Sequence, residues 1–179
     1  MDGRGVTLAE IMIVVAIMGI IASIATPNLL SYLPKYRLRK AARDVYSNMQ
    51  KAKMKAIKQS DSVRLRFDRT TTPGFYYFDD SNSDDDGDGS NWDPGEERIE
   101  LSEYFSGVNY GLGGATQRWD GQACPANCTQ TAMLTFNSQG TSNAGTVYLD
   151  NQQNRECYAI TTSTSGALRI RFFDGTNWD

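Results

Sequence analysis

The first apolar stretch of the chain covers residues 6–25 and is interrupted only by Thr7, Glu10 and Ser23. A helix rises about 1.5 Å per residue, so twenty residues reach about 30 Å, the thickness of the hydrocarbon core of a bilayer. We therefore predict a transmembrane helix over residues 6–26. Its single carboxylate, on Glu10, is unexpected, because a charge inside a membrane span is costly unless another group pairs with it.

Residues 27–60 are expected to continue this helix in amphipathic form. Apolar residues recur there at spacings of three and four, which forms one narrow stripe along a helix. The stripe consists of Leu38, Ala42, Val45, Met49, Ala52 and Ala56. We expect it to pack on the rest of the protein and the helix to end near Gln59. Pro27 and Pro34 each remove a backbone donor and clash with the preceding turn, so we expect a kink or a locally melted stretch there.

After residue 60 the pattern changes to the alternation that is typical of β-strands. Further strands are predicted for short alternating runs separated by polar turns. The predicted strands cover residues 63–67, 75–79, 98–105, 132–136, 146–150, 158–163 and 168–173. Short strands joined by polar turns favour an antiparallel sheet or two packed sheets. The predicted fold class is α+β, with a long N-terminal helix packed on a β-rich globular domain over residues 61–179.

The amino-acid composition and the net charge exclude several classes of function. The chain has 179 residues, a formal net charge of -3 and no histidine. The absence of histidine excludes Ser-His-Asp and Cys-His nucleophile pairs, histidine-bearing zinc sites and c-type haem attachment. No paired-carboxylate motif and no glycine-rich phosphate motif stands out, so we predict that the protein is not an enzyme. The net charge is also too mild for a bulk nucleic-acid binder.

The N-terminal stretch GVTLAEIMIVVAIMGIIASIATPNLLSY resembles the class III signal of type IV pilins and type II secretion pseudopilins. In that family a prepilin peptidase cuts after a glycine, the new N-terminus is methylated, and a glutamate five residues in is retained. The matching positions are Gly5, Val6 and Glu10, which makes residues 1–5 a leader peptide. The first mature residue of the family is usually phenylalanine, so Val6 departs from the pattern.

The resemblance also implies a purpose for the unexpected carboxylate. In the lipid-embedded core of a filament, Glu10 of one subunit would neutralise the α-amino group of Val6 on its neighbour, because a buried charge is tolerable when it is paired. We assign assembly roles to Glu10 and to Thr7, which lies three residues before it. The implied partners are other pseudopilins or pilins, the prepilin peptidase and the inner membrane.

Residues 134–178 resemble the C-terminal pattern of the GspH/FimT minor pseudopilins. The quoted features are a Phe-x-x-x-Gly turn at 136–140, a Gly-Thr-Val strand at 145–147, a Tyr-Ala strand at 158–159 and a Gly-x-x-Arg-x-Arg hairpin at 166–171. The resemblance implies a pilin-like fold and a structural function. We expect a minor pseudopilin subunit of a type II secretion pseudopilus, which supports protein export across the outer membrane.

The alternative function is that of a minor pilin of a type IV pilus, acting in pilus initiation or DNA uptake. In that case Arg169 and Arg171, joined by Arg64 and Arg66, would form a basic strand face that contacts phosphates. A solvated outer face of the sheet is the competing interpretation of these arginines. The basic residues of the segment 35–58 have the same two interpretations, a solvated helix face or a partner surface.

The family signal places the protein in the bacterial inner membrane as a single-pass protein with its globular domain in the periplasm. The positive-inside rule disagrees, because Arg4 alone precedes the span whereas Lys35, Arg37 and further cations follow it. We follow the family signal, because the leader must face a cytoplasmic peptidase and the globular domain carries all three cysteines.

The acidic segment DDSNSDDDGDGSNWDPGEE lies between two predicted strands, at residues 79–97. Carboxylate and amide oxygens occur in it at the spacing of a twelve-residue calcium loop. The candidate ligands are Asn82, Asp84, Asp86, Asp88, Asp93 and Glu96, divided between two overlapping registers. A calcium ion here would be structural, with a dissociation constant of ~10⁻⁴–10⁻³ M. A solvated acidic loop without metal is the alternative.

Three cysteines allow one disulfide and one free thiol. An oxidising periplasm favours a disulfide. We favour Cys124–Cys128, which closes the tight CPANC loop, and the alternatives join either of these residues to Cys157.

Overall fold

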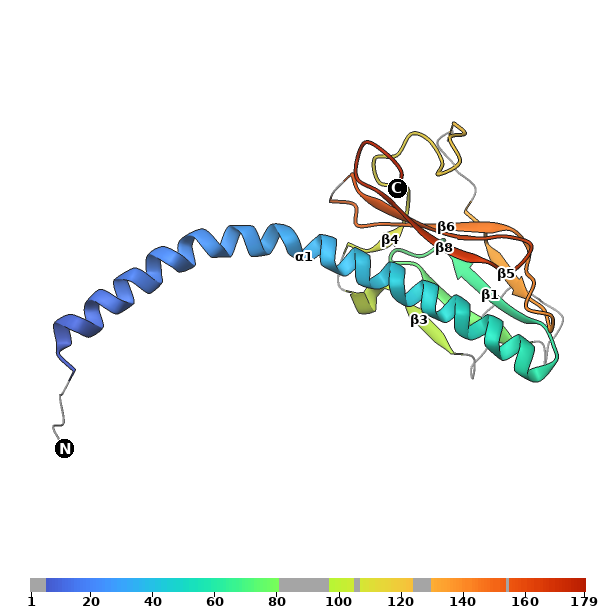
Figure 1. The fold of residues 1–179 in the computed structure, drawn as a ribbon, viewed down its shortest axis with the longest axis horizontal. Helices are drawn as coiled ribbons and strands as arrows, with labels where there is room; N and C mark the ends of the chain where they lie inside the picture. The colour runs from blue at the N-terminus through green and yellow to red at the C-terminus, as the bar shows by residue number, and fades with distance from the viewer. Residues whose placement is uncertain (1–5, 81–96, 105–106, 124–129, 154) are drawn as a thin grey trace. The chain divides into compact units, whose positions relative to one another are not determined.

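The computed structural model describes residues 6–80, 97–104, 107–123, 130–153 and 155–179 (Figure 1). The chain divides into two compact units, Met1–Pro34 and Lys35–Asp179. One helix, α1 (Leu8–Gln59), runs through both of them. It continues through Pro27 and Pro34, so neither proline melts the helix. Its end at Gln59 agrees with the prediction.

The first unit is the N-terminal part of α1. Its apolar side chains lie on the surface, with Leu8, Ile17 and Ile24 exposing between 51% and 78% of their area. Within the part of the chain that the structure describes, no helix combines the length and the apolar character that crossing a membrane requires.

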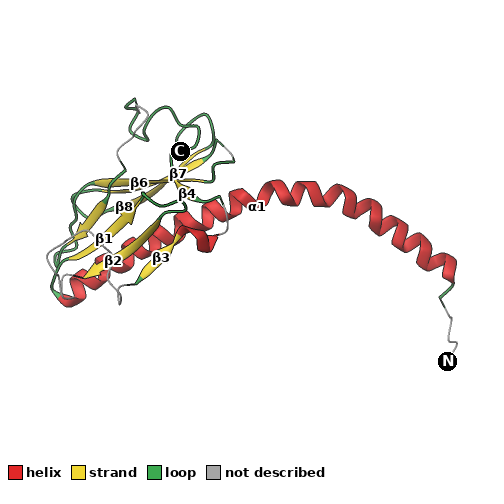
Figure 2. Cartoon of the chain, turned by 180° about the vertical axis from the view of Figure 1, so that it is seen from behind, coloured by secondary structure: helices red, strands yellow, loops and turns green. Residues whose placement is uncertain are grey.

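The second unit contains two four-stranded antiparallel sheets (Figure 2). Sheet A has the strand order β3-β2-β1-β5, and its strands are β1 (Val63–Asp68), β2 (Phe75–Asp80), β3 (Arg98–Glu100) and β5 (Met133–Phe136). Sheet B has the order β4-β6-β7-β8, and its strands are β4 (Asn109–Tyr110), β6 (Gly145–Asp150), β7 (Cys157–Thr162) and β8 (Leu168–Phe173). Of the two predicted arrangements, a single antiparallel sheet or two sheets, the structure has the second.

The core forms where α1 packs on both sheets. Every residue of the predicted apolar stripe is completely buried, together with Ala41. The stripe packs against inward-facing side chains of β1, such as Leu65, and of β7, such as Ile160. The alternation in β1 is as predicted, because Val63, Leu65 and Phe67 are buried while the arginines between them are only half-buried.

Two strand predictions need correction. The expected strand 98–105 ends at Glu100, and Leu101–Tyr104 form a 3₁₀ helix (η1) that buries Leu101 and Tyr104. The two-residue strand β4 was not predicted, because two residues carry no alternation that a sequence pattern can reveal.

A tight corner joins the last turns of α1 to two hairpin turns. Gly140 lies in the turn between β5 and β6, and Gly166 in the turn between β7 and β8. Both have positive φ angles, 74° and 72°, and the carbonyl of Gly140 lies directly against the Cα of Gly166. Lys53 donates a hydrogen bond to the carbonyl of Gly166 at 2.9 Å. These are the glycines of the two motifs at 136–140 and 166–171, so those motifs fix how α1 meets the sheets.

Candidate functional site

The N-terminal segment Val6–Glu10 is the first candidate site. Thr7 precedes α1, and its Oγ1 accepts a hydrogen bond from the backbone N–H of Glu10 at 3.3 Å. Thr-x-x-Glu at a helix start is the sequence of a capping box, in which the hydroxyl satisfies a free N–H of the first turn. The carboxylate of Glu10 lies in that first turn, where the helix dipole favours a negative charge. Thr7 therefore has a local role in starting the helix.

The carboxylate of Glu10 lies on an exposed apolar surface. Among the described residues, no cation pairs with it. Its neighbours Ile11 and Val14 expose 53% and 44% of their area. Gly5, the predicted cleavage position, lies outside the described residues, so the Gly5–Val6 cleavage site stays a prediction.

The predicted calcium loop lies outside the described residues, which resume at Glu97. All six candidate ligands, from Asn82 to Glu96, belong to this segment. In the described ranges there is no group of three or more acidic or cysteine side chains arranged to hold a metal ion. Glu97, at the end of the acidic segment, forms an ion pair with Lys51 of α1 at 2.7 Å. The calcium prediction is therefore not tested by the geometry.

Cys157 is a free thiol that is completely buried on β7. It forms neither of the alternative disulfides with Cys124 or Cys128. These two cysteines lie outside the described residues, and their pairing stays a prediction. Burial raises the pKa of the Cys157 thiol to about 12, with a smaller contribution from the charge of Asp150. A thiol with such a pKa is not a nucleophile at neutral pH.

We expect Cys157 to be unreactive in the folded protein. In a Cys124→Ser/Cys128→Ser variant at pH 8, a thiol reagent such as DTNB should label the chain only after denaturant is added. The physical reason is that both access and thiolate formation require unfolding. Labelling within minutes under native conditions would contradict the burial of this residue.

The arginines of the proposed basic face do not form one surface. Arg64 and Arg66 lie on β1 of sheet A, and both face Asp79, with the Nε of Arg66 at 2.6 Å from Oδ2. Arg169 and Arg171 lie on β8 of sheet B, where the guanidinium of Arg171 stacks on the ring of Trp119 at 4.5 Å. Arg64 and Arg66 share the single carboxylate of Asp79 and lie on a different sheet from Arg169 and Arg171. A phosphate contact by these arginines stays a prediction.

Several cations of α1 have partners inside the second unit. Lys35 forms an ion pair with Glu156, and Lys40 lies over the ring of Tyr104 at 5.7 Å. Lys51 and Lys53 contact Glu97 and the carbonyl of Gly166. These contacts tie α1 to the loops of the domain, so this part of the basic segment is neither a purely solvated face nor free for a partner.

A buried polar cluster between α1 and sheet A was missed by sequence reasoning. The amide of Asn48 donates a hydrogen bond to the hydroxyl of Tyr76 at 2.7 Å. Burial raises the pKa of Tyr76 to about 12 and raises the pKa of Tyr104 as well. Tyrosine and asparagine residues often lie at half-exposed positions of helices and strands, so their occurrence in the sequence does not predict a buried cluster. It offers no nucleophile and no base at neutral pH.

Asp150 is a second buried polar residue that the sequence did not reveal. Its Oδ2 accepts a hydrogen bond from the N–H of Gly113 at 3.0 Å, while Oδ1 is buried without a hydrogen-bond partner among the described residues. Burial raises the pKa of this carboxyl, and backbone hydrogen bonds from Gly113 and Gln152 oppose the rise only in part.

This shift predicts a pH dependence of stability. Because the folded protein holds the Asp150 proton more tightly than the unfolded chain does, the stabilising contribution is complete below the ordinary aspartate pKa of about 3.9. It is lost as pH rises through the higher folded-state pKa. The stability of the unmodified protein relative to Asp150→Asn should therefore decrease as the pH rises above about 4. Urea unfolding of both proteins at several pH values measures this difference, and a difference that does not vary with pH would contradict the shift.

Comparisons with known proteins agree with this geometry. Residues 41–166 match the family described as Type II transport protein GspH, and residues 2–26 match the prokaryotic N-terminal methylation motif. The chain is 29% identical over 113 residues to the pilin-like protein PilA1 of Thermus thermophilus. That alignment covers 63% of this chain and 64% of PilA1, which is less than two thirds of the relative's length.

The structure is similar to a crystal structure of the type IV minor pilin FimU of Pseudomonas aeruginosa. The TM-score is 0.52 at 14% sequence identity, and the match covers 83% of this chain and 96% of FimU. At this identity the likeness concerns the fold alone. It confirms the predicted pilin-like α+β fold, a long helix packed on antiparallel sheets.

Proposed function

The chain belongs to the GspH family of pilin-like type II transport proteins, and from this membership we propose that it is a minor pseudopilin of a type II secretion pseudopilus. Members of this family are structural subunits and not enzymes, so the prediction that the protein is not an enzyme is confirmed. The proposal adds the machine, the cellular position and the mechanism of assembly.

One observation carries the proposal: the methylation motif includes the start of an exposed apolar helix whose single carboxylate, on Glu10, has no cation partner among the described residues. The motif covers residues 2–26, and the large apolar side chains that follow Glu10 in the described part of this segment are exposed. An apolar helix surface needs a cover, which is supplied by lipid before assembly and by neighbouring subunits afterwards. We therefore propose a bacterial inner-membrane protein, anchored once, with its globular domain in the periplasm.

Assembly follows from the charges. Prepilin peptidase would release the α-amino group of Val6 by cutting after Gly5, and methylation would keep it positively charged. In the filament core the Glu10 carboxylate of a neighbouring subunit would pair with it. Because each charge is costly when it is buried alone, the pair sets the axial register between subunits.

Type II secretion and a type IV pilus are distinguished by deletion of the gene in its own host. We expect the deletion to abolish the extracellular accumulation of proteins that carry a secretory signal, and the intact gene to restore it. Surface pili and DNA uptake should be unchanged. Normal secretion together with loss of pili or of DNA uptake would overturn the proposal in favour of a type IV minor pilin.

For the acidic segment we propose, on the spacing of its ligands alone, a structural calcium ion. With a dissociation constant of about 1 mM, 10 mM calcium stabilises the folded state by about 1.4 kcal/mol, or about 3–5 °C in melting temperature. Thermal melts of the protein in detergent micelles, with calcium or with EGTA, measure this shift. An Asp84→Asn/Asp86→Asn variant should melt at the same temperature in both buffers. Identical melts of the unmodified protein would remove the metal.

A further inference from the structure

β8, one of the two outer strands of sheet B, presents an open edge. At its C-terminal end the carbonyl of Phe172 accepts a hydrogen bond from the N–H of Asp179 at 2.8 Å. At the other end, in the hairpin, the carbonyl of Ala167 accepts a bond from the N–H of Ser163 and so faces β7. The polar groups of successive strand residues point to alternate sides. The N–H and C=O of Leu168 and Ile170 therefore point away from β7, to the same side as those of Phe172.

The main-chain groups of Leu168 and Ile170 on this side have no hydrogen-bond partner among the described residues. The return segment after β8 covers only the end of the strand, through Phe172 and Asp174. A row of unpaired N–H and C=O groups is a template for the addition of another strand. The open stretch is the N-terminal half of the six-residue strand β8, next to the corner at Gly166.

In sheet A, by contrast, the outer strand β5 has main-chain groups that are hydrogen-bonded by a side chain of the same protein. There the side chain of Asn143 accepts a hydrogen bond from the N–H of Thr135 at 2.7 Å and donates one to the carbonyl of Met133 at 3.0 Å. A side chain of the same protein therefore occupies the free groups of β5. The contrast shows that this fold covers an edge by its own residues at β5 and leaves the edge at β8 uncovered.

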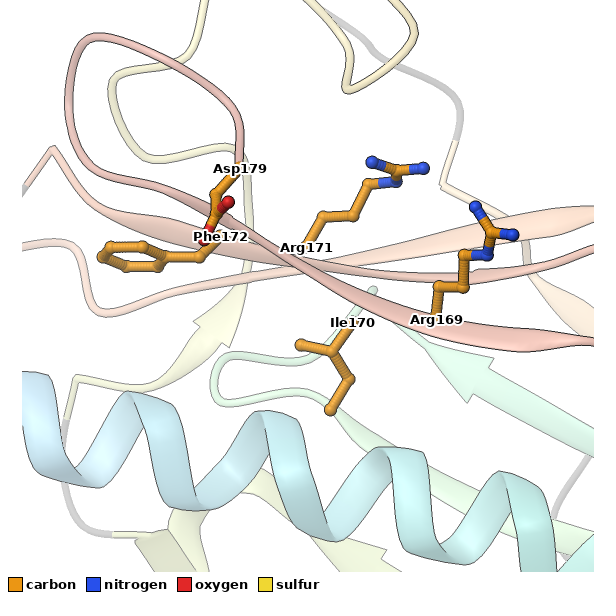
Figure 3. A pocket seen from close by; sticks show the side chains of 5 residues that line it. All are labelled: Arg169, Ile170, Arg171, Phe172 and Asp179. Carbon is orange, nitrogen blue, oxygen red and sulfur yellow. The ribbon is translucent and has the colours of Figure 1, made fainter.

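A hollow of about 400 Å³ runs along the open edge, lined by residues 169–172 and Asp179 (Figure 3). Arg169 and Arg171 project from one face of β8, and Ile170 projects from the opposite face toward α1 (Figure 3). Ile170 exposes 36% of its area, and among the described strand residues it is the one large apolar side chain that is exposed. The edge thus combines unpaired backbone groups, two cations on one face and an apolar side chain on the other.

We propose that β8 binds an extended, acidic strand of another protein by β-strand addition. The bound strand would pair with the free groups of Leu168 and Ile170. Its carboxylates would lie on the face of Arg169 and Arg171, and an apolar side chain would lie beside Ile170. Alternation of acidic and apolar residues satisfies both faces of the edge, since side chains of a strand alternate.

Two strands of a second copy do not fit this edge. Two β8 strands in antiparallel register would bring the arginines of one copy against those of the other, which is destabilising. The acidic outer strand β3 has only three residues, and its Glu100 is already paired with Arg98 at 3.0 Å. The occupant that we propose is a different chain. This inference does not depend on which filament the protein serves.

The test uses the full chain in non-ionic detergent at low salt and two fluorescein-labelled five-residue peptides, one of alternating Glu and Val and one of alternating Lys and Val. Fluorescence anisotropy should give at least tenfold tighter binding of the acidic peptide. Ile170→Pro removes the N–H that points away from β7, a change that an edge strand tolerates, together with the apolar side chain beside the bound strand, and should weaken that binding at least tenfold. Arg169→Glu should abolish the preference between the two peptides, because the face then carries one charge of each sign.

The matched control is Arg69→Glu, which makes the same charge change in the exposed turn between β1 and β2 of the other sheet. It should leave the preference unchanged. Equal affinity for the two peptides, or full binding by a folded Ile170→Pro protein, would overturn the proposal. If Ile170→Pro does not fold, the exposed Arg169→Glu variant decides, because an unchanged peptide preference in that variant is equally contrary to the proposal.

Discussion

Replacing Gly166 by alanine is expected to lower the free energy of unfolding by about 3–4 kcal/mol. Two effects add at this position. The φ angle of 72° is one that side-chain-bearing residues rarely adopt, and a Cβ there would overlap the carbonyl of Gly140. That carbonyl belongs to the backbone of a second hairpin turn, which itself packs against Ile57 and Lys53 of α1. The atom that an added Cβ would overlap therefore belongs to the backbone, and it cannot move aside as the end of a flexible side chain would.

The matched control for this substitution is Gly121→Ala. Gly121 has a similar φ angle of 81°, but an added Cβ meets nothing within 4 Å. Gly121→Ala should lower the free energy of unfolding by about 1 kcal/mol, because only the unfavourable backbone conformation of the alanine contributes. Urea unfolding followed by circular dichroism gives both values. Equal losses of unfolding free energy in the two variants would mean that the contact between the turns does not contribute to the effect. The backbone conformation alone would then explain the glycine at position 166.

The elements with a regular burial pattern were predictable from the sequence. The apolar stripe of α1 and the alternation in β1 each predict which face of the element is buried. The structure confirms both predictions. The hairpin glycines were predictable as members of a motif. The physical reason for these glycines, the contact between the Gly140 and Gly166 turns, was not predictable. It joins two turns that are separated in the sequence by the strands β6 and β7.

The remaining features depend on contacts between distant parts of the chain. Lys35 and Lys53 read as members of a solvated basic face, yet their partners lie 121 and 113 residues away. The Asn48–Tyr76 hydrogen bond and the buried carboxyl of Asp150 are invisible for the same reason. The open edge of β8 also required the strand order, since no local pattern tells an outer strand from an inner one.

Replacing Glu10 by alanine is expected to leave the protein in the membrane and to reduce its incorporation into filaments by at least roughly tenfold. The reason is that the neighbour's α-amino group would stay buried without its partner, which costs about 3–5 kcal/mol. The helix start should survive, because the bond to Thr7 comes from the backbone N–H of residue 10 and not from its side chain. Incorporation is measured by immunoblotting of sheared filaments against the membrane fraction.

Two further variants separate the charge from the helix cap. Glu10→Gln keeps the size of the side chain and removes its charge, so it should be as defective as the alanine variant. Thr7→Ala removes the hydroxyl that accepts the Glu10 N–H and should destabilise the first turn by about 1 kcal/mol, with a smaller loss of incorporation. Normal incorporation of Glu10→Gln would show that the carboxylate does not act as a charge. A defect of Thr7→Ala equal to that of Glu10→Ala would show that formation of the first helical turn limits incorporation as much as the carboxylate does.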